Sequence, residues 1–215
     1  MRPLQIGRVR FSEIFWNIVE EKVDEVPWDE LESMVKSRQK YRLDADYKTG
    51  SIGVRDAAEL YRLVKFFKPE IIAEVGTFIG VSTMAMYMSD EFLRIYTCDV
   101  SNDIPALFED ADEIIKYYPK TTSTDMFRHL AEKKVGVDLM YLDGRLQQED
   151  FQYFPQIIHD QTIFVFDDFE GTEKGVVNAM MLDGANRLLV YPRDGKKTAI
   201  SIPLTMLQFL PQESV

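Results

Sequence analysis

The sequence predicts an α/β protein with a doubly wound, mostly parallel sheet of seven strands and an N-terminal helical extension. Short apolar segments alternate with segments of helical periodicity from residue 71 to residue 182, which indicates repeated strand–helix units. Four of the five apolar segments in this region have an acidic residue at or near their carboxyl end. Two further apolar segments, joined by the short polar turn 192–197, form a hairpin, so the last strand must run antiparallel to its neighbours.

Two helices and a loop precede the sheet. Ser12 is the expected N-cap of a helix over 13–23, and Pro27 precedes a second helix over 28–40. The first helix carries an apolar stripe, which either packs on the main domain, covers the substrate or forms a dimer surface: Ile14, Phe15, Ile18 and Val19. We assign residues 1–54 to N-terminal helices with a lid loop near 47–52, and residues 55–215 to the main domain.

The main domain is expected to begin with a helix over residues 55–67. The predicted strands are 71–75, 94–98, a weak strand 120–123, 137–142, 162–166, 186–191 and 198–203. The predicted helices between them are 81–89, 104–116, 126–133, 150–158 and 172–182.

Composition narrows the class of protein. The 215 residues, 46% of them hydrophobic, can bury the core of one α/β domain. A formal net charge of -11 opposes nonspecific attraction to nucleic acid or to an anionic membrane, so neither is an expected partner. The single cysteine, Cys98, lies in an apolar segment and cannot form an internal disulfide, which fits a reducing, cytoplasmic setting. No signal peptide or membrane-spanning segment is evident.

The stretch 71–88, IIAEVGTFIGVSTMAMYM, has the layout of a ligand-binding strand, turn and helix. Its glycines, Gly76 and Gly80, are four residues apart, so it matches neither GxGxxG nor GxxxxGK[ST], and a different nucleotide-like ligand is indicated. Ser82 and Thr83 open the helix, where free N–H groups favour a carboxylate or phosphate. The alternative is that both are ordinary first-turn residues.

Acidic residues at the strand ends would face one crevice, because ligands of open α/β sheets lie across the carboxyl ends of the strands. Asp99 has the position of an acid that accepts hydrogen bonds from a ribose, and the polar turn 122–125 could meet a base edge. If the strands before Asp143 and Asp167 are neighbours, about 4.8 Å apart, their carboxylates converge with that of Asp168. Mg²⁺ would relieve their repulsion; otherwise they cap helices or face solvent.

Four motifs resemble those of class I S-adenosylmethionine-dependent methyltransferases. They are GluValGlyThrPheIleGlyValSer (74–82), TyrThrCysAspVal (96–100), TyrLeuAspGly (141–144) and PheAspAspPhe (166–169). The match covers about residues 52–203 and is strongest to the catechol O-methyltransferase-like and macrolide-sugar O-methyltransferase branches. It implies a Rossmann-like fold and S-adenosylmethionine as the cofactor.

The resemblance also implies roles for individual residues. The cofactor-binding residues would be Glu74, Gly76, Thr77, Phe78, Gly80, Ser82, Asp99, Ser123, Asp125 and Asp143. Glu74, Gly76 and Ser82 would border the methionine part, Asp99 the ribose, and Ser123 or Asp125 the adenine. Asp143, Asp167 and Asp168 would be the Mg²⁺ ligands of the branches that use a metal.

The chain departs from both branches at the catalytic base. Leu146 stands where the catechol branch has a lysine, and Arg145 stands where the sugar branch has a second aspartate. Asp143 is therefore the candidate catalytic residue, unless a metal-bound hydroxyl loses its proton without a dedicated base. Arg145 could instead hold an anionic substrate or face solvent.

The resulting hypothesis is a Mg²⁺-assisted O-methyltransferase acting on a hydroxyl of a small molecule, with a sugar or polyol favoured over a catechol. One alternative is a metal-independent methyltransferase for a small acid or amine. Another is a non-catalytic S-adenosylmethionine-binding module. A homodimer is left open.

Overall fold

The computed structural model describes residues 3–43, 50–90, 92–101, 104, 107, 108, 111, 113–182, 184 and 186–209. Among the described helices, none combines the length and the apolar character that crossing a membrane requires. Of the predicted lid loop near 47–52, the structure describes only residues 50–52.

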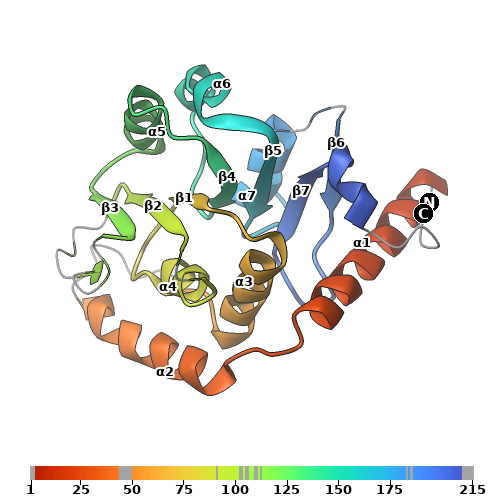
Figure 1. The fold of residues 1–215 in the computed structure, drawn as a ribbon, viewed down its shortest axis with the longest axis horizontal. Coiled ribbons are helices and arrows are strands. Elements are labelled where there is room, and N and C mark those ends of the chain that lie inside the picture. The colour runs from red at the N-terminus through yellow and green to blue at the C-terminus, as the bar shows by residue number, and fades with distance from the viewer. Residues whose placement is uncertain are drawn as a thin grey trace.

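The centre of the molecule is one seven-stranded sheet with the strand order β3-β2-β1-β4-β5-β7-β6 (Figure 1). Its strands are β1 (Ile71–Val75), β2 (Arg94–Asp99), β3 (Ile115–Pro119), β4 (Val137–Leu142), β5 (Ile158–Phe166), β6 (Arg187–Val190) and β7 (Ala199–Pro203). The pairs among β1 to β5 are parallel, whereas β7 is antiparallel to both β5 and β6. The predicted sheet, with its antiparallel last strand, is confirmed.

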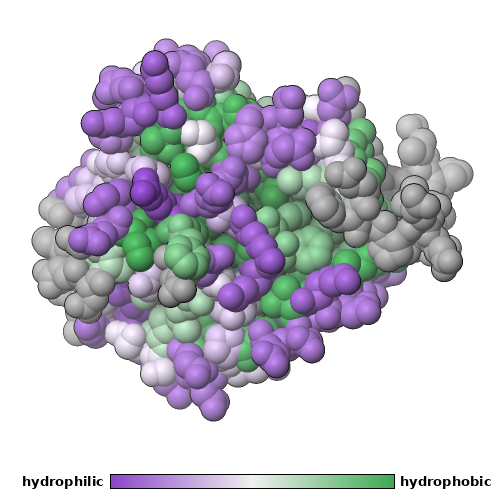
Figure 2. Space-filling view, viewed as in Figure 1, coloured by the Kyte–Doolittle hydropathy of each residue, from purple (hydrophilic) through white to green (hydrophobic). Residues whose placement is uncertain are grey.

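Helices cover both faces of this sheet (Figure 1). They are α1 (Pro3–Lys22), α2 (Trp28–Arg38), α3 (Val54–Phe67), α4 (Val81–Tyr87), α5 (Ser123–Glu132), α6 (Phe154–Ile157) and α7 (Lys174–Met181). Short 3₁₀ segments occupy η1 (Gln39–Leu43), η3 (Gln148–Gln152) and η4 (Leu204–Phe209). On the face seen in Figure 2, hydrophilic residues cover the outer surface over α5 and α6, and hydrophobic residues show mainly between the helical layers.

The alternation of side chains along each strand divides the core into two layers. Ile72 of β1 belongs to a cluster with buried residues of α1 to α4, whereas the next residue, Ala73, belongs to a cluster with α5, α6 and α7. The apolar stripe of α1 lies in the first layer, where Phe15 and Val19 are each 1% exposed. These two residues of the stripe therefore pack on the main domain, rather than covering the substrate or forming a dimer surface.

The structure corrects three predicted elements. Ile115 and Lys116, expected at the end of a helix over 104–116, begin β3, and the weak strand expected at 120–123 is a turn leading into α5. The apolar pair Ile114 and Ile115 extends the helical pattern, but pairing of β3 with β2 decides the conformation. The helix expected over 150–158 is instead η3 and α6, and residue 158 already belongs to β5.

The predicted start of the first helix is wrong, because α1 extends back to Pro3 and places Ser12 inside the helix. The hydroxyl of Ser12 accepts a hydrogen bond from the backbone N–H of Tyr191, and Trp16 donates to the Tyr191 carbonyl. Ser12 therefore joins α1 to the end of β6 rather than capping a helix. Cys98 is 1% exposed, as predicted, and burial raises the pKa of its thiol.

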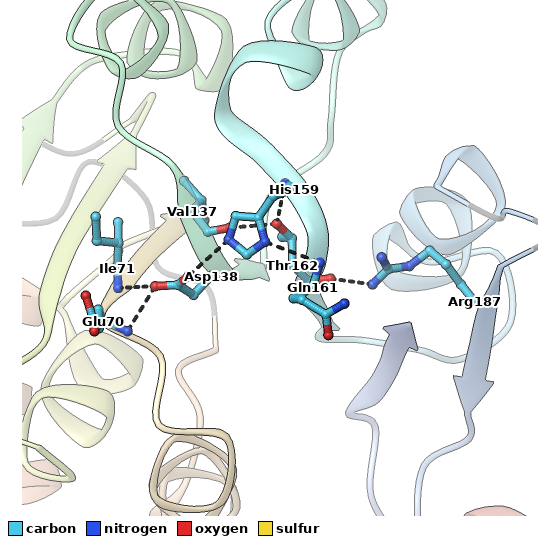
Figure 3. Close-up of polar contacts among 8 residues, drawn as sticks. All are labelled: Glu70, Ile71, Val137, Asp138, His159, Gln161, Thr162 and Arg187. Carbon is cyan, nitrogen blue, oxygen red and sulfur yellow. Dashed lines mark hydrogen bonds and ion pairs between the residues drawn. The ribbon is translucent and has the colours of Figure 1, made fainter. Parts of the chain in front are cut away.

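A polar cluster ties together the amino ends of three strands (Figure 3). Oδ2 of Asp138 in β4 accepts hydrogen bonds from the backbone N–H groups of Glu70 and Ile71 at 3.0 and 2.8 Å. Its Oδ1 lies 3.0 Å from Nε2 of His159 in β5. Asp138 thus fixes β1 and β5 to β4 at the end of the sheet opposite to the predicted ligand site.

Candidate functional site

Two cavities open at the carboxyl ends of the parallel strands. The first, about 330 Å³, is lined by Asp99, Val100, Ser123 and Arg145 among others, and we call it the Asp99 cavity. The second, about 480 Å³, is lined by residues that include Asp167, Asp168, Lys174 and Lys196, and we call it the Asp167 cavity. Gly76 and Asp143 line both cavities, so a reaction between two ligands could take place beside them.

The glycine turn after β1 is shaped by close backbone contacts. Gly76 has φ 102°, and a Cβ there would lie 3.0 Å from the carbonyl carbon of Asp143, so a side chain would push the turn away from the loop after β4. Gly80 has φ 74° and is the N-cap residue of α4. Phe78, another predicted cofactor residue, lines the Asp167 cavity, whereas Thr77 is buried with its hydroxyl 2.6 Å from that of Thr97.

Glu74 is fully buried behind this turn and binds other side chains of the protein. Its carboxylate accepts hydrogen bonds from the hydroxyls of Ser82, Thr83 and Thr97. Burial raises the pKa of Glu74 to about 7, although the hydroxyl donors oppose this shift. Glu74 and Ser82 therefore hold α4 against β1 and β2, and their predicted place beside the methionine part of the cofactor stays a prediction.

Asp99 ends β2 and joins the glycine turn to the Asp99 cavity. Its Oδ2 accepts a 2.7 Å hydrogen bond from the N–H of Phe78, and its Oδ1 accepts one of 2.8 Å from the N–H of Ser101. A carboxylate has about four acceptor sites and so can accept several hydrogen bonds at once. Asp99 lines the cavity, and its ribose-binding role stays a prediction.

The two residues predicted for adenine are separated by the structure. Ser123 lines the Asp99 cavity and donates a 2.8 Å hydrogen bond to Asp150. Asp125 instead lies in the first turn of α5, where its backbone N–H donates to the hydroxyl of the N-cap Thr122 and its carboxylate accepts from that hydroxyl and pairs with Arg128. Of the two, Ser123 is the residue that lines the cavity, and the adenine role stays a prediction.

Three carboxylates converge at the ends of β4 and β5, as the sequence predicted. One oxygen from each of Asp143, Asp167 and Asp168 lies within 4.8 Å of the others. Burial, opposed by Lys174, raises the pKa of Asp143 to about 6. Burial, followed by the charges of Asp143 and Asp168, raises the pKa of Asp167 to about 8.

Lys174 is the main feature of this site that sequence reasoning missed. It is the first residue of α7, and its Nζ lies 2.5 Å from Oδ1 of Asp143 and 3.0 Å from Oδ2 of Asp168. The carboxylates raise the pKa of its ammonium, which outweighs the opposing effect of burial. No local sequence pattern predicts the role of this lysine, because Lys174 is far from Asp143 in the chain and meets it only through the packing of α7.

The donor set of this cluster fits a hard divalent cation. Mg²⁺ prefers carboxylate oxygens, and the three aspartates supply them from neighbouring strand ends. Lys174, however, already provides a positive charge to two of them. Leu146, which stands where the catechol branch has a lysine, is buried. The ammonium that contacts this cluster is that of Lys174 from α7.

No protein-family model matches the sequence, and no curated protein matches it. Among solved structures, the S-adenosylhomocysteine-bound methyltransferase PaMTH1 from Podospora anserina is similar with a TM-score of 0.61 at 13% identity, covering 90% of this chain and 95% of that chain. An O-methyltransferase from Bacillus cereus in complex with S-adenosylhomocysteine has a TM-score of 0.58 at 14% identity, covering 86% and 94%. TomG from Streptomyces achromogenes, an O-methyltransferase of tomaymycin synthesis solved with S-adenosylmethionine, has a TM-score of 0.56 at 13% identity, covering 80% and 89%.

These likenesses show the fold. The chain has the Rossmann-like fold of these methyltransferases over 80–90% of its length, which confirms the sequence-based resemblance at the level of architecture.

Proposed function

We propose that this protein is an S-adenosylmethionine-dependent O-methyltransferase that acts on a hydroxyl of a small molecule. The observation that carries the proposal is the pair of adjoining cavities that share Gly76 and Asp143. The first cavity contains Asp99, an acid placed to accept hydrogen bonds from the ribose of a cofactor. The second contains the carboxylate cluster, which suits a hydroxyl-bearing acceptor. The fold shared with solved O-methyltransferases supports the same reaction.

S-adenosylmethionine is assigned to the Asp99 cavity. In this assignment the Asp99 carboxylate accepts hydrogen bonds from the ribose hydroxyls, and Ser123 and Arg145 border the adenine. The glycine turn allows the methionine part to pass close to the backbone at Gly76, where a side chain would collide with the Asp143 loop. The methyl group would then point toward the Asp167 cavity.

The acceptor is assigned to the Asp167 cavity, with its hydroxyl beside Asp143. The sulfonium already activates the methyl group, so the protein mainly aligns the acceptor oxygen and removes its proton. The oxygen–methyl bond forms as the sulfur–methyl bond breaks, S-adenosylhomocysteine leaves, and the hydroxyl proton passes to the Asp143 carboxylate. The pKa of Asp143, raised to about 6, makes it a stronger base than an ordinary aspartate.

Asp143, Asp167 and Asp168 are proposed to hold Mg²⁺. When bound, the ion would lower the pKa of a coordinated acceptor hydroxyl. The three side chains also accept hydrogen bonds from vicinal hydroxyls, whichever cation is present.

A sugar or another polyol is the proposed acceptor class. The cavity wall is rich in polar groups such as Asp56, Lys196 and Thr198, and Phe78 is its only aromatic residue among those the structure describes. Such a wall suits several hydroxyls better than a flat aromatic ring. Gly50 and Ile52 line the same cavity, which supports a lid role for their loop.

The test uses S-adenosylmethionine with a labelled methyl group and separate sets of sugars, catechols, carboxylic acids and amines. Transfer to hydroxyl-bearing acceptors, lost in Asp143→Asn, is the expected result. Transfer only to amines or acids would contradict the proposal, and cofactor binding by calorimetry without transfer to any acceptor would favour the non-catalytic module.

A parallel assay in excess chelator, with and without added Mg²⁺, tests the metal. The ion pairs of Lys174 with Asp143 and Asp168 support the metal-independent alternative, because the ammonium already supplies a positive charge to these carboxylates. Undiminished turnover in the chelator would therefore select that alternative.

A further inference from the structure

The acidic cluster contains its own counter-cation. Lys174 is 25% exposed and makes ion pairs with Asp143 and Asp168, one from the end of β4 and one from the end of β5. The other lysines of the cavity wall are engaged elsewhere, since Lys196 pairs with Asp56 and Lys197 pairs with Glu170. Among the described ion pairs, those of Lys174 are the ones that reach the cluster.

The position of Lys174 is set by the packing of α7. Gly175, the next residue, brings the helix so close to the loop after β5 that a Cβ there would lie 2.0 Å from the carbonyl oxygen of Asp167. Asp168 has φ 49°, a left-handed conformation that turns the chain back toward α7. The start of α7 therefore faces the carboxylates at short range.

A metal ion and this ammonium would compete for the same oxygen atoms. Mg²⁺ binds carboxylate oxygens at about 2.0–2.1 Å, so an ion on Oδ1 of Asp143 would lie less than about 5 Å from Nζ of Lys174. Two cations so close repel one another, and the carboxylate lone pairs that the metal needs are partly used by the lysine.

We propose that Lys174 and a divalent metal ion are mutually exclusive occupants of the Asp143 and Asp168 carboxylates, so that metal binds only when the lysine leaves the cluster. This inference rests on the proposed metal site but not on methyl transfer. Lys174 is then a positioning residue: it keeps the like charges together in the metal-free protein and sets how tightly the protein binds metal.

The first test measures metal affinity without turnover. Mn²⁺ binding followed by electron paramagnetic resonance, and Mg²⁺ binding followed by calorimetry, are compared in the unaltered protein and in Lys174→Met. We expect the dissociation constant to fall at least tenfold in the variant. An equal or weaker affinity would overturn the proposal.

The matched control is Lys196→Met, which removes the same charge from the wall of the same cavity but from a lysine paired with Asp56. Its metal affinity should change less than threefold. An increase as large as that of Lys174→Met would mean that general charge, rather than direct competition, controls binding, and would also overturn the proposal.

A second measurement uses the unaltered protein and so does not depend on the variant folding. Reductive methylation of lysine amines, read by mass spectrometry, should proceed faster at Lys174 in saturating Mg²⁺ than in chelator, because the displaced amine is exposed. Lys36, paired with Glu32 on the surface of α2, is the internal reference and should react equally in both. A Lys174 rate that Mg²⁺ leaves unchanged contradicts exclusion.

The two proposals can fail separately. Tighter metal binding in Lys174→Met with no methyl transfer to any acceptor would preserve this inference and remove the proposed function. Methyl transfer with no effect of Lys174 on metal affinity would do the opposite.

Discussion

Nδ2 of Asn178 donates a 2.8 Å hydrogen bond to the carbonyl oxygen of Gly144, which joins the middle of α7 to the loop after β4. Oδ1 of the same side chain accepts a 3.1 Å hydrogen bond from the N–H of Leu146. Asn178 is fully buried, so its amide replaces water for both backbone groups. The helix that carries Lys174 is thereby fixed to the loop that carries Asp143.

Replacing Asn178 with leucine should destabilise the protein by about 2 kcal/mol or more. The substitution keeps the side chain at a similar size but leaves the carbonyl of Gly144 and the N–H of Leu146, which is buried, without their partner. Urea unfolding measures the loss. Val177→Ala, at a neighbouring position of α7 that is 36% exposed, is the control and should change stability by less than about 0.5 kcal/mol. Equal losses in the two variants would argue against the hydrogen bonds as the cause.

Gly175→Ala tests the close approach of α7 to the loop after β5. The added methyl group would lie 2.0 Å from the carbonyl oxygen of Asp167, so the helix must move, and a cost of about 2 kcal/mol or more is expected. Gly184→Ala is the matched control, because the nearest atom to its Cβ is 3.9 Å away in the Arg187 side chain. Thermal unfolding compares the two. Similar melting temperatures for both variants would show that this contact is not tight in solution.

Glu59 should make stability fall as the pH rises. Burial raises its pKa to about 7, above the ordinary value of 4.5, although Lys196 opposes the shift. The folded state therefore binds the proton more tightly than the unfolded state does, and this contribution, present below pH 4.5, is lost as the pH rises through about 7. The contribution of this protonation to the free energy of unfolding is roughly 2–3 kcal/mol.

Glu59→Gln cannot ionise and should lack this part of the pH dependence. The stability of the variant relative to the unaltered protein is expected to increase by roughly 2–3 kcal/mol between pH 4.5 and pH 8, measured by urea unfolding at each pH. Parallel pH curves for the two proteins would rule out titration of this buried carboxyl as the source.

The sequence could predict the elements whose signals are local. The apolar run 71–75 followed by Gly76 and Gly80 identified β1 and its turn, and the aspartates after β4 and β5 predicted the carboxylate cluster. Both follow from the rule that parallel strands end at one edge of a sheet.

The remainder depended on contacts that no short segment contains. Lys174 reaches the cluster because Gly175 lets α7 approach Asp167, and neither residue has a distinctive sequence context. The β3 strand was read as the end of a helix, since its conformation comes from pairing with β2. The three hydroxyls that bind Glu74 also come from separate segments, and its predicted place beside the ligand stays a prediction.

Asp138→Ala should destabilise the protein without affecting the ligand site. The variant removes the acceptor of the N–H groups of Glu70 and Ile71 and the partner of His159, which should cost about 2 kcal/mol (Figure 3). Affinity for S-adenosylhomocysteine in the folded variant should stay within twofold, because Asp138 is the second residue of β4 and the cavities lie beyond the other end of that strand. Asp160→Ala, at an exposed position of β5, is the control for chemical denaturation. A large loss of ligand affinity would contradict a purely structural role.

Asp99→Asn should weaken S-adenosylhomocysteine binding at least tenfold, measured by calorimetry. The carboxylate accepts hydrogen bonds from Phe78 and Ser101 and lines the cavity assigned to the ribose, and an amide removes both the charge and one acceptor. Asp125→Asn in the same assay tests the sequence-based adenine role. Its carboxylate is held by Arg128 and Thr122 on α5, so we expect less than a twofold change. A tenfold loss in Asp125→Asn with none in Asp99→Asn would reverse the assignment of these two acids, and would move the proposed cofactor site away from the end of β2 toward the start of α5.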